Sequence, residues 1–321
     1  MSKKKSGTSA LVAIASAALL TLSACGGGDS DNPAAESTVK ALTADEWVSN
    51  VSEYKDAVNW DTAEVLTLDL GADAMEPDAL ELTAGSPYEI QISNSGSTEL
   101  GVTAPELFRA SAVRKTESGA EIKLYQFLDV YVNAGKTVSL FLVPVVPGTY
   151  PLTGVSDGAP VAGLTGTLKV TGSVPTDPEP VIENVSSLDP PAGAADLITA
   201  AMPTWDADAA AVTITMDDNG DVGFYKPEDT TLKVGVPATI TFTNEGSILH
   251  VYECEEFLMT TAMWKVAGSE GYDTGLQVRP ADVEAGVSTS LYVIPTVAGV
   301  YELTDSAPGM EEISVTITVT K

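Results

Sequence analysis

The sequence predicts an all-β protein built from two tandem antiparallel β-sandwiches, with a short helix ahead of the first. Apolar residues alternate with polar ones along short segments, and Gly and Pro punctuate these segments at close spacing. The second half of the chain repeats the first. The 27 glycines, 19 prolines and 6% aromatic content of the 321 residues also suit β-rich domains better than a helical bundle.

Residues 1–24 have the features of an export signal. A basic stretch at residues 3–5 precedes an apolar run at residues 10–22, which is too short for an ordinary membrane-spanning helix. The following "LSAC" resembles the lipobox of bacterial lipoproteins, and this resemblance implies that Cys25 becomes the lipidated first residue of the mature chain. We therefore expect a cell membrane lipoprotein on the extracytoplasmic face, extracellular or periplasmic. The alternative is a plain secretory signal with a chance cysteine.

Residues 25–40 are polar, Gly-rich and poor in apolar side chains, as expected of a flexible tether. The formal charge of the chain is −29, from 45 acidic and 16 basic residues. Nucleic acid and anionic membrane surfaces would be repelled, so both are excluded as binding partners. The acids are spread along the whole chain, which favours a role in solubility over attraction of cations or cationic partners.

A helix is predicted over residues 43–58, directly before the first sandwich. Thr43 and Glu46 have the spacing of a capping box, and four apolar residues recur at helical spacing from Trp47 to Val58. We expect this apolar stripe to pack on its own sandwich.

The repeat appears when residue n is placed over residue n + 150. "SPYEIQISNSGSTELG" then lies over "VPATITFTNEGSILHV" without a gap, and Asn94 falls on Asn244. With one extra residue in the second copy, "VPVVPGTY" lies over "IPTVAGVY". This pattern predicts a first domain at 41–171 and a second at 194–321, joined by a Pro- and acid-rich linker at 172–193.

Three blocks of the second copy resemble the cupredoxins, the Greek-key sandwich family that includes plastocyanin and azurin. "FYKPEDTTLKVGVPATITFTN" matches the early F-x-P…V-x-x-G…N pattern, and "HVYECEEF" matches the first copper ligand and its strand. "AGVYELTDSAPGM" lies where the family has G-x-Y-x-x-x-C-x-x-P-G-H. The resemblance covers most of residues 60–171 and 205–320, and it implies a cupredoxin-like fold for both copies.

The same resemblance implies a metal site only in altered form. A blue-copper centre needs two imidazoles, a thiolate and a weak axial thioether. Position by position, the first histidine is His250, the cysteine position holds Asp305 and the second histidine position holds Met310. The thiolate is missing, so we expect no blue-copper electron transfer. These three side chains could hold Cu(II) or Zn(II) weakly, and the alternative is that His250 is an ordinary core or rim residue.

The first copy carries Leu100, Gly154 and Ala159 at the three matching positions, so it is expected to bind no copper through side chains. Cys254 would have no disulfide partner if Cys25 carries lipid, and we expect it to be buried and inert. It lies four residues beyond the histidine, roughly 13 Å along an extended strand, too far to share an ion without a bend.

A second motif, "DDNGDVGFYKPE", places acidic or amide side chains at positions 1, 3, 5 and 12 of a calcium-loop count: Asp217, Asn219, Asp221 and Glu228. Position 6 is Val222, where that loop requires glycine, so a plain β-turn is favoured.

Catalytic arrangements are hard to build from this composition. The chain has one histidine, no nucleophile-elbow motif and no Gly-rich phosphate loop after a strand. We therefore expect a binding or interaction module, not an enzyme, with no cofactor. Its expected partners are the membrane, through lipidated Cys25, and an unidentified surface protein. The alternative function is binding or handling of copper or another metal at a non-blue site formed by His250, Asp305 and Met310.

Overall fold

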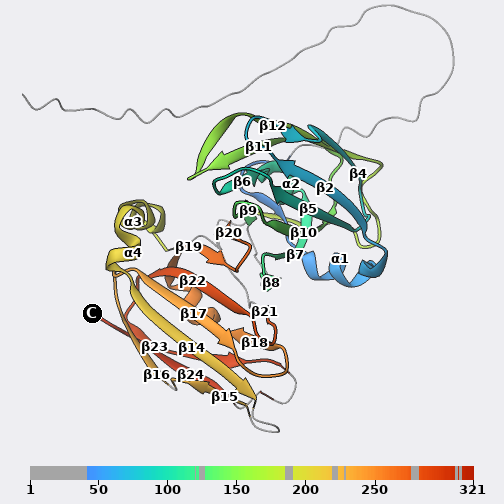
Figure 1. Ribbon diagram of the computed structural model, residues 1–321. Coiled ribbons are helices and arrows are strands. Elements are labelled where there is room, and N and C mark those ends of the chain that lie inside the picture. The colour runs from blue at the N-terminus through green and yellow to red at the C-terminus, as the bar shows by residue number, and fades with distance from the viewer. Residues whose placement is uncertain are drawn as a thin grey trace, which may run out of the picture. The chain divides into compact units, whose positions relative to one another are not determined.

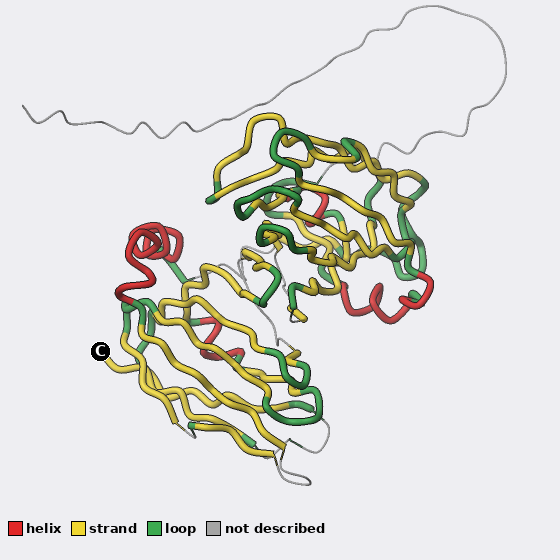
Figure 2. Tube along the Cα trace, viewed as in Figure 1, coloured by secondary structure: helices red, strands yellow, loops and turns green. Residues whose placement is uncertain are grey.

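The computed structural model describes residues 42–119, 121–122, 127–184, 191–218, 223–227, 229–275, 282–307, 310 and 313–321. Strands dominate these residues, and the helices are few and short (Figures 1 and 2). Residues 39–321 form one compact unit. Within the described ranges, no helix combines the length and the apolar character needed to cross a membrane. The predicted export signal, Cys25 and the tether lie outside the described residues.

The first copy begins with a short strand and a helix, and its sandwich follows. Its elements are β1 (Glu46–Val48), α1 (Val51–Ala57), the 3-10 helix η1 (Trp60–Thr62), β2 (Glu64–Leu70), β3 (Met75–Glu76), β4 (Ala79–Thr83), β5 (Tyr88–Asn94), β6 (Leu100–Thr103), α2 (Pro105–Arg109), β7 (Ser111–Glu117), β8 (Glu121–Ile122), β9 (Phe127–Val132), β10 (Thr137–Pro144), β11 (Gly148–Ser156) and β12 (Ala159–Thr171).

The second copy repeats this series after β13 (Ile182–Asn184). Its elements are α3 (Ala194–Ala201), the 3-10 helix η3 (Met202–Thr204), α4 (Trp205–Asp208), β14 (Ala210–Asp218), β15 (Gly223–Lys226), β16 (Asp229–Lys233), β17 (Ala238–Asn244), β18 (His250–Glu253), α5 (Glu255–Met259), β19 (Thr261–Ala267), β20 (Gly271–Gly275), β21 (Asp282–Val283), β22 (Ser288–Pro295), β23 (Gly299–Asp305) and β24 (Ser314–Thr320).

Each copy is a two-sheet sandwich with the same strand order. In the first copy one sheet runs β3-β2-β5-β10-β7-β8 and the other runs β4-β12-β11-β6-β9. In the second copy the orders are β15-β14-β17-β22-β19-β20 and β16-β24-β23-β18-β21. The β2–β5 and β4–β12 pairs are parallel, as are β14–β17 and β16–β24. The sheets are therefore mixed, whereas the strand pattern predicts purely antiparallel ones, because alternation of side chains does not depend on strand direction. The Greek-key sandwich fold that the cupredoxin resemblance implies is confirmed.

The sandwich cores follow from the alternating sequence pattern. In β5 and β17 every second residue is buried and the residues between are partly exposed. The inward side chains include Ile90 and Ile92 in β5 and Ile240 and Phe242 in β17. Each such burial contributes about 1.5–3 kcal/mol to folding, and a one-residue slip of register would turn all of these side chains to solvent.

The predicted helix before the first sandwich exists but begins later than the capping-box spacing indicates. The Thr43 amide does donate to the Glu46 carboxylate at 2.8 Å. The next residues nevertheless form strand β1, which pairs with β13, and this strand buries Trp47. The helix starts only at Val51, and Tyr54 provides its buried face.

Part of the predicted linker is bound to the first copy. The Tyr54 hydroxyl donates to the Pro178 carbonyl at 2.8 Å, the Ser49 amide donates to the Val181 carbonyl at 2.9 Å, and the Val181 amide donates to Asn50 Oδ1 at 2.9 Å. These bonds hold residues 178–184 against the start of the first copy.

Candidate functional site

The site centres on His250, the only histidine of the chain, at the first residue of β18. Its approach loop is fixed by the buried amide of Asn244, which donates to the Ile248 and Val283 carbonyls, each at 2.7 Å, and accepts from the Gly246 amide at 2.8 Å. The fixed loop delivers the imidazole into the sandwich, where only 1% of the residue is exposed.

The first copy has the same loop without the histidine. Asn94 donates to the Thr98 and Val132 carbonyls, each at 2.8 Å, and accepts from the Gly96 amide at 2.9 Å. The loop is therefore a structural feature that both copies share. The copies differ in the residue that follows the loop, which is Leu100 in the first and His250 in the second.

Asp305, at the end of β23, pairs directly with the histidine. The His250 Nδ1 and Asp305 Oδ2 atoms are 2.5 Å apart, and Asp305 is also 1% exposed. Its other oxygen, Oδ1, accepts from the Val251 amide at 3.0 Å and from the Ala307 amide at 2.9 Å. Because an ionised carboxylate only accepts, this arrangement places a proton on Nδ1.

The hydrogen bonds to Asp305 control its charge. Burial alone would raise the pKa of the carboxyl, but the bonds from His250, Ala307 and Val251 outweigh burial and hold the pKa below its usual value. The carboxylate is therefore ionised over the physiological range. Burial, followed by the charge of Asp305, raises the pKa of the nearby Tyr225 phenol well above its usual value.

The other ring nitrogen of the histidine, Nε2, has no hydrogen-bond partner among the described residues. Tyr225 is also buried, its ring centroid lies 6.4 Å from that of the imidazole, and its hydroxyl is near the Asp305 carboxylate. Tyr225 is not among the residues that the sequence predicts for this site. Its one sequence signal is its place in "FYKP", on β15, within the motif that resembles a calcium loop.

The pair geometry tests whether the predicted ligands fit a metal ion. Two ligands at about 2.0–2.1 Å from a tetrahedral Zn(II) or copper ion lie roughly 3.3 Å apart. His250 Nδ1 and Asp305 Oδ2 are closer than that, at 2.5 Å, with a proton between them. An ion held by both atoms does not fit unless the pair separates.

Met310, the third predicted ligand, lies on the loop after Asp305 and is buried, with 6% exposed. Its amide donates to the Ala307 carbonyl and its own carbonyl accepts from the Ile313 amide, each at 2.9 Å. The structure thus brings His250 and Asp305 together and places Met310 on the adjoining loop. Among the described residues, no three His, Cys, Asp or Glu side chains gather closely enough to hold a metal ion.

The equivalent place in the first copy is apolar. Gly154 pairs with Val102 as Asp305 pairs with Tyr252, so the sequence alignment and the strand register agree. A Cβ atom at Gly154 would lie 2.4 Å from the Leu164 Cβ, so leucine fills the space of the missing side chain.

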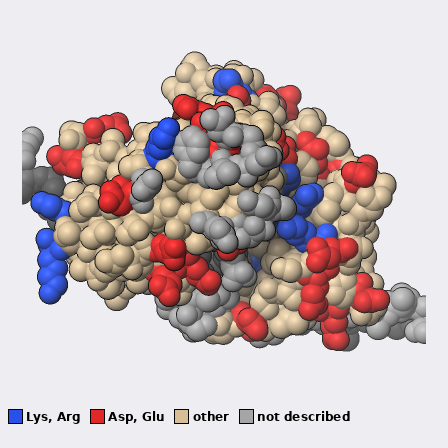
Figure 3. All heavy atoms as spheres, turned by 90° about the horizontal axis from the view of Figure 1, so that it is seen from below, with Lys and Arg blue, Asp and Glu red and all other residues tan. Residues whose placement is uncertain are grey.

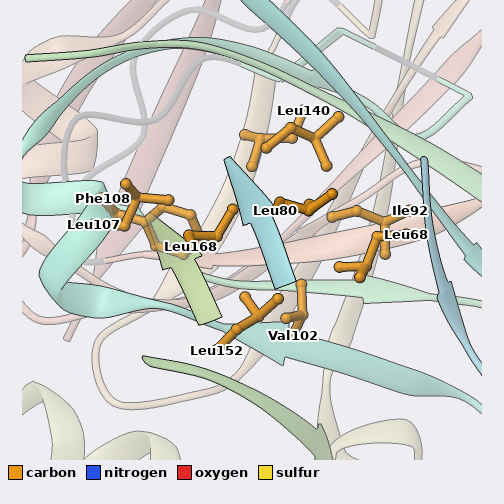
Figure 4. A pocket seen from close by; sticks show the side chains of 10 residues that line it. Leu68, Leu80, Ile92, Val102, Leu107, Phe108, Leu140, Leu152 and Leu168 are labelled. Atoms are coloured by element: carbon orange, nitrogen blue, oxygen red, sulfur yellow. The ribbon is translucent and has the colours of Figure 1, made fainter. Parts of the chain in front are cut away.

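Leu100, in the place of the histidine, is buried. The remaining predicted position, Ala159, is exposed at the start of β12. The apolar side chains at the centre of this sandwich leave a cavity of only about 10 Å³ (Figure 4), which is about the space of one water probe.

Cys254 is buried, as predicted, with 5% exposed. Burial raises the pKa of its thiol to about 12, so it is not a thiolate donor at physiological pH. It follows β18 directly and precedes α5.

The first two residues of the "DDNGDV" motif, Asp217 and Asp218, end β14, and β14 pairs antiparallel with β15. Asn219, Asp221, Val222 and Glu228 lie outside the described residues. Asp218, not Asp217, makes the local contacts: its carboxylate accepts from both the amide and the hydroxyl of Ser247. The hydroxyl bond is the main reason why the pKa of Asp218 is lowered.

No protein-family model matches this chain, and no curated protein sequence does. Among solved structures it is similar to a copper-containing nitrite reductase from Thermus scotoductus (12% identity, TM-score 0.31, covering 81% of this chain and 62% of that one). It is also similar to the copper nitrite reductase from Nitrosomonas europaea (13% identity, TM-score 0.29, covering 81% and 95%). A third match is a multi-copper oxidase from Pediococcus acidilactici (10% identity, TM-score 0.33, covering 81% and 59%).

The chain spans less than two thirds of the Thermus and Pediococcus structures. At these low identities and TM-scores the matches carry no argument about this chain. The strand order of each copy is the evidence for the cupredoxin-like fold.

Proposed function

We propose that this chain is an extracytoplasmic interaction module, built on two cupredoxin-like sandwiches and held at the membrane by lipid on Cys25. It performs no catalysis and carries no electron. One observation carries the proposal: at the position of the family's thiolate, Asp305 binds His250 Nδ1 at 2.5 Å.

The pair supports a structural role because its hydrogen-bonding capacity is largely used inside the protein. Asp305 accepts three hydrogen bonds, two of them from backbone amides of its own sandwich. Buried ionisable groups persist in folded proteins when they are paired and hydrogen-bonded in this way. In the first copy the matching residue is Gly154, and the Leu164 side chain fills the space beside it. The two copies therefore fill the same space with different side chains.

The distribution of acidic side chains favours solubility over storage of cations. Acidic side chains occur in several separate groups over the face in Figure 3. Separate groups of like charge keep a protein soluble. The partner is a surface protein that tolerates an acidic surface.

A second candidate function is metal handling, and one observation favours it. Histidines that bind metals commonly donate their other ring N–H to a carboxylate, which fixes the tautomer. His250 does this through Nδ1, and its Nε2 has no partner among the described residues. In this candidate Asp305 orients the imidazole while Nε2 binds copper or another metal, and Met310, on the loop after Asp305, is the predicted thioether ligand.

Metal titration of the full chain separates the two candidates. Metal content and binding of Cu(I), Cu(II) and Zn(II) are measured for the wild type, for His250→Leu and for Leu100→Ala, which changes the matching position of the first copy. The interaction module predicts the same weak binding in all three proteins. Near-stoichiometric metal that is lost in His250→Leu and retained in Leu100→Ala would overturn the module in favour of metal handling.

A further inference from the structure

The two copies meet through reciprocal strand pairs. β20 of the second copy pairs antiparallel with β9 of the first, and β21 pairs with β8 (Figure 1). By order in the repeat, β20 corresponds to β8 and β21 to β9. Each copy therefore contributes the same two strands, and both sheets continue from one sandwich into the other.

Polar contacts reinforce this junction. The Asn133 amide donates to the Glu270 carbonyl at 2.9 Å, and the Lys136 ammonium lies 3.0 Å from the Glu270 carboxylate. The rings of Tyr131 and Tyr272 stack with centroids 4.4 Å apart. The contacts join both backbone and side chains across the two copies.

One carboxyl group lies within the apolar interior of the junction. Asp273, in the middle of β20, is 0% exposed. Its strand neighbours in register are Val130 of the first copy and Val266 of the second, both also 0% exposed. The Thr116 hydroxyl of β7 donates to Asp273 Oδ2, and Oδ1 has no hydrogen-bond partner among the described residues.

This environment disfavours the ionised carboxylate. A buried carboxylate needs several donors or a cation to offset the loss of water, and Asp273 has one neutral donor from the opposite copy. Separation of β20 from β9 would expose the group to water, where ionisation is free of this penalty. The junction and the charge of Asp273 are therefore coupled.

We propose that Asp273 makes the junction between the two copies sensitive to pH: the strands stay paired while the carboxyl is protonated, and they separate more often once it ionises. This inference does not depend on the function proposed above.

Other charged groups near the junction do not compensate the negative charge of an ionised Asp273. On β7, Lys115 and Glu117 flank Thr116, so their side chains point to the opposite face of the strand. The Lys115 Nζ and Glu117 Oε1 atoms are 2.5 Å apart. On β9, Asp129 accepts from Thr274, on the face opposite to Asp273.

Two further ionisable groups flank Asp273 along its own strand and in the opposite sheet. Tyr272, the neighbour of Asp273 on β20, donates to Glu99 at 2.7 Å. Asp282 of β21 lies in the opposite sheet, paired in register with Glu121 of β8. On β19, the Lys265 ammonium lies 4.2 Å from the centroid of the Tyr272 ring. Among the described residues, the only hydrogen bond to the Asp273 side chain comes from Thr116.

The size of the effect follows from linkage. Burial raises the pKa of Asp273 to about 7, with the Thr116 bond acting in the opposite direction. In the separated state the pKa returns to about 3.9. A raised folded pKa means that the junction is most stable at low pH and weakens as the pH rises from about 4 to 7. Between pH 5 and pH 8 the opening equilibrium should increase roughly 80-fold.

The test is hydrogen–deuterium exchange of the full chain at pH 5 and pH 8, corrected for the intrinsic pH dependence of amide exchange. In the wild type, peptides that cover β9 and β20 should lose protection by roughly 80-fold at pH 8. Peptides that cover β17, within the second sandwich, should change much less and serve as the internal reference.

Two variants complete the experiment. Asp273→Asn keeps the shape and the Thr116 acceptor but cannot ionise, so its junction should stay protected at both pH values. Asp129→Asn is the matched control, because it changes an acid at the same junction that is only partly buried, and it should behave as the wild type. Equal protection of the wild-type junction at pH 5 and pH 8, or loss of protection in Asp273→Asn at pH 8, would overturn the proposal.

Discussion

Removal of Asp305 should destabilise the second sandwich strongly, and simultaneous removal of its partner should recover part of the loss. Asp305→Ala leaves His250 Nδ1 and two backbone amides buried without an acceptor. Loss of one partner of a buried pair costs about 3–5 kcal/mol of unfolding free energy. His250→Leu, which introduces the residue found in the first copy, leaves Asp305 with its two amide donors and should cost less.

The double variant Asp305→Ala with His250→Leu removes both polar side chains together. Its cost should fall below the sum of the single costs by about 1–3 kcal/mol, because residues in direct contact couple by up to this amount. Guanidinium unfolding of the four proteins, followed by tryptophan fluorescence, measures these values. The chain has four tryptophans, and Trp205 and Trp264 lie in the second copy.

The outcome that would refute this reasoning is additivity. If the single costs sum to the double cost within about 0.5 kcal/mol, and Asp305→Ala costs under about 1 kcal/mol, then the pair does not support the sandwich. The matching change in the first copy, Leu100→Ala, serves as the control for simple loss of buried volume, at about 2–5 kcal/mol.

Four further predictions follow from individual residues. The lowered pKa of Asp305 means that its bonds stabilise the fold above the unfolded pKa of about 3.9, and that this contribution is lost as the pH falls through the folded value. Asp305→Asn should therefore lose less unfolding free energy than the wild type below pH 4 in acid titrations. Cys254, with a thiol pKa of about 12, should not react with a disulfide reagent at pH 8 until the chain is unfolded, and prompt reaction of the folded protein would contradict its burial. Asn244→Ala and Asn94→Ala each remove three hydrogen bonds and should each cost about 2–4 kcal/mol in denaturant unfolding, whereas unequal effects would show that the two loops are not equivalent. Cys25→Ala should release the protein from the membrane fraction and abolish incorporation of radiolabelled palmitate, and retention in that fraction would exclude the lipid anchor.

The sandwich fold could be predicted from the sequence because the signals for its strands are periodic and occur in both copies. Alternation along β5 and β17 predicts which side chains point inward, and the 150-residue offset locates each element of the second copy from the first. The sequence pattern misplaces the helix start, because a capping-box bond between Thr43 and Glu46 also forms in the turn before β1. Local bonds of this kind do not distinguish a helix from a turn until tertiary pairing decides.

Only some residues of the candidate site could be predicted from the sequence. Position-by-position comparison with cupredoxins located His250 and Asp305, whose side chains are in direct contact in the structure. A metal-ligand role for Asp305 stays a prediction, and the structure adds a direct contact between its carboxylate and the imidazole. The burial of Tyr225 and Asp273 could not be predicted from the sequence. Burial of a polar group depends on pairing between distant strands, and this pairing leaves no pattern in the local sequence.

The most direct test of the central claim uses the single histidine of the chain, whose imidazole gives one set of nitrogen signals in a long-range proton–nitrogen NMR spectrum. The closed pair predicts a proton on His250 Nδ1, and spectra that do not change when Zn(II) or Cu(I) is added. Asp305→Asn should perturb the Nδ1 signal, whereas Met310→Leu should leave it in place. Loss of the Nδ1 proton, or a metal-dependent shift of the Nε2 signal, would contradict the claim that Asp305 has closed this site.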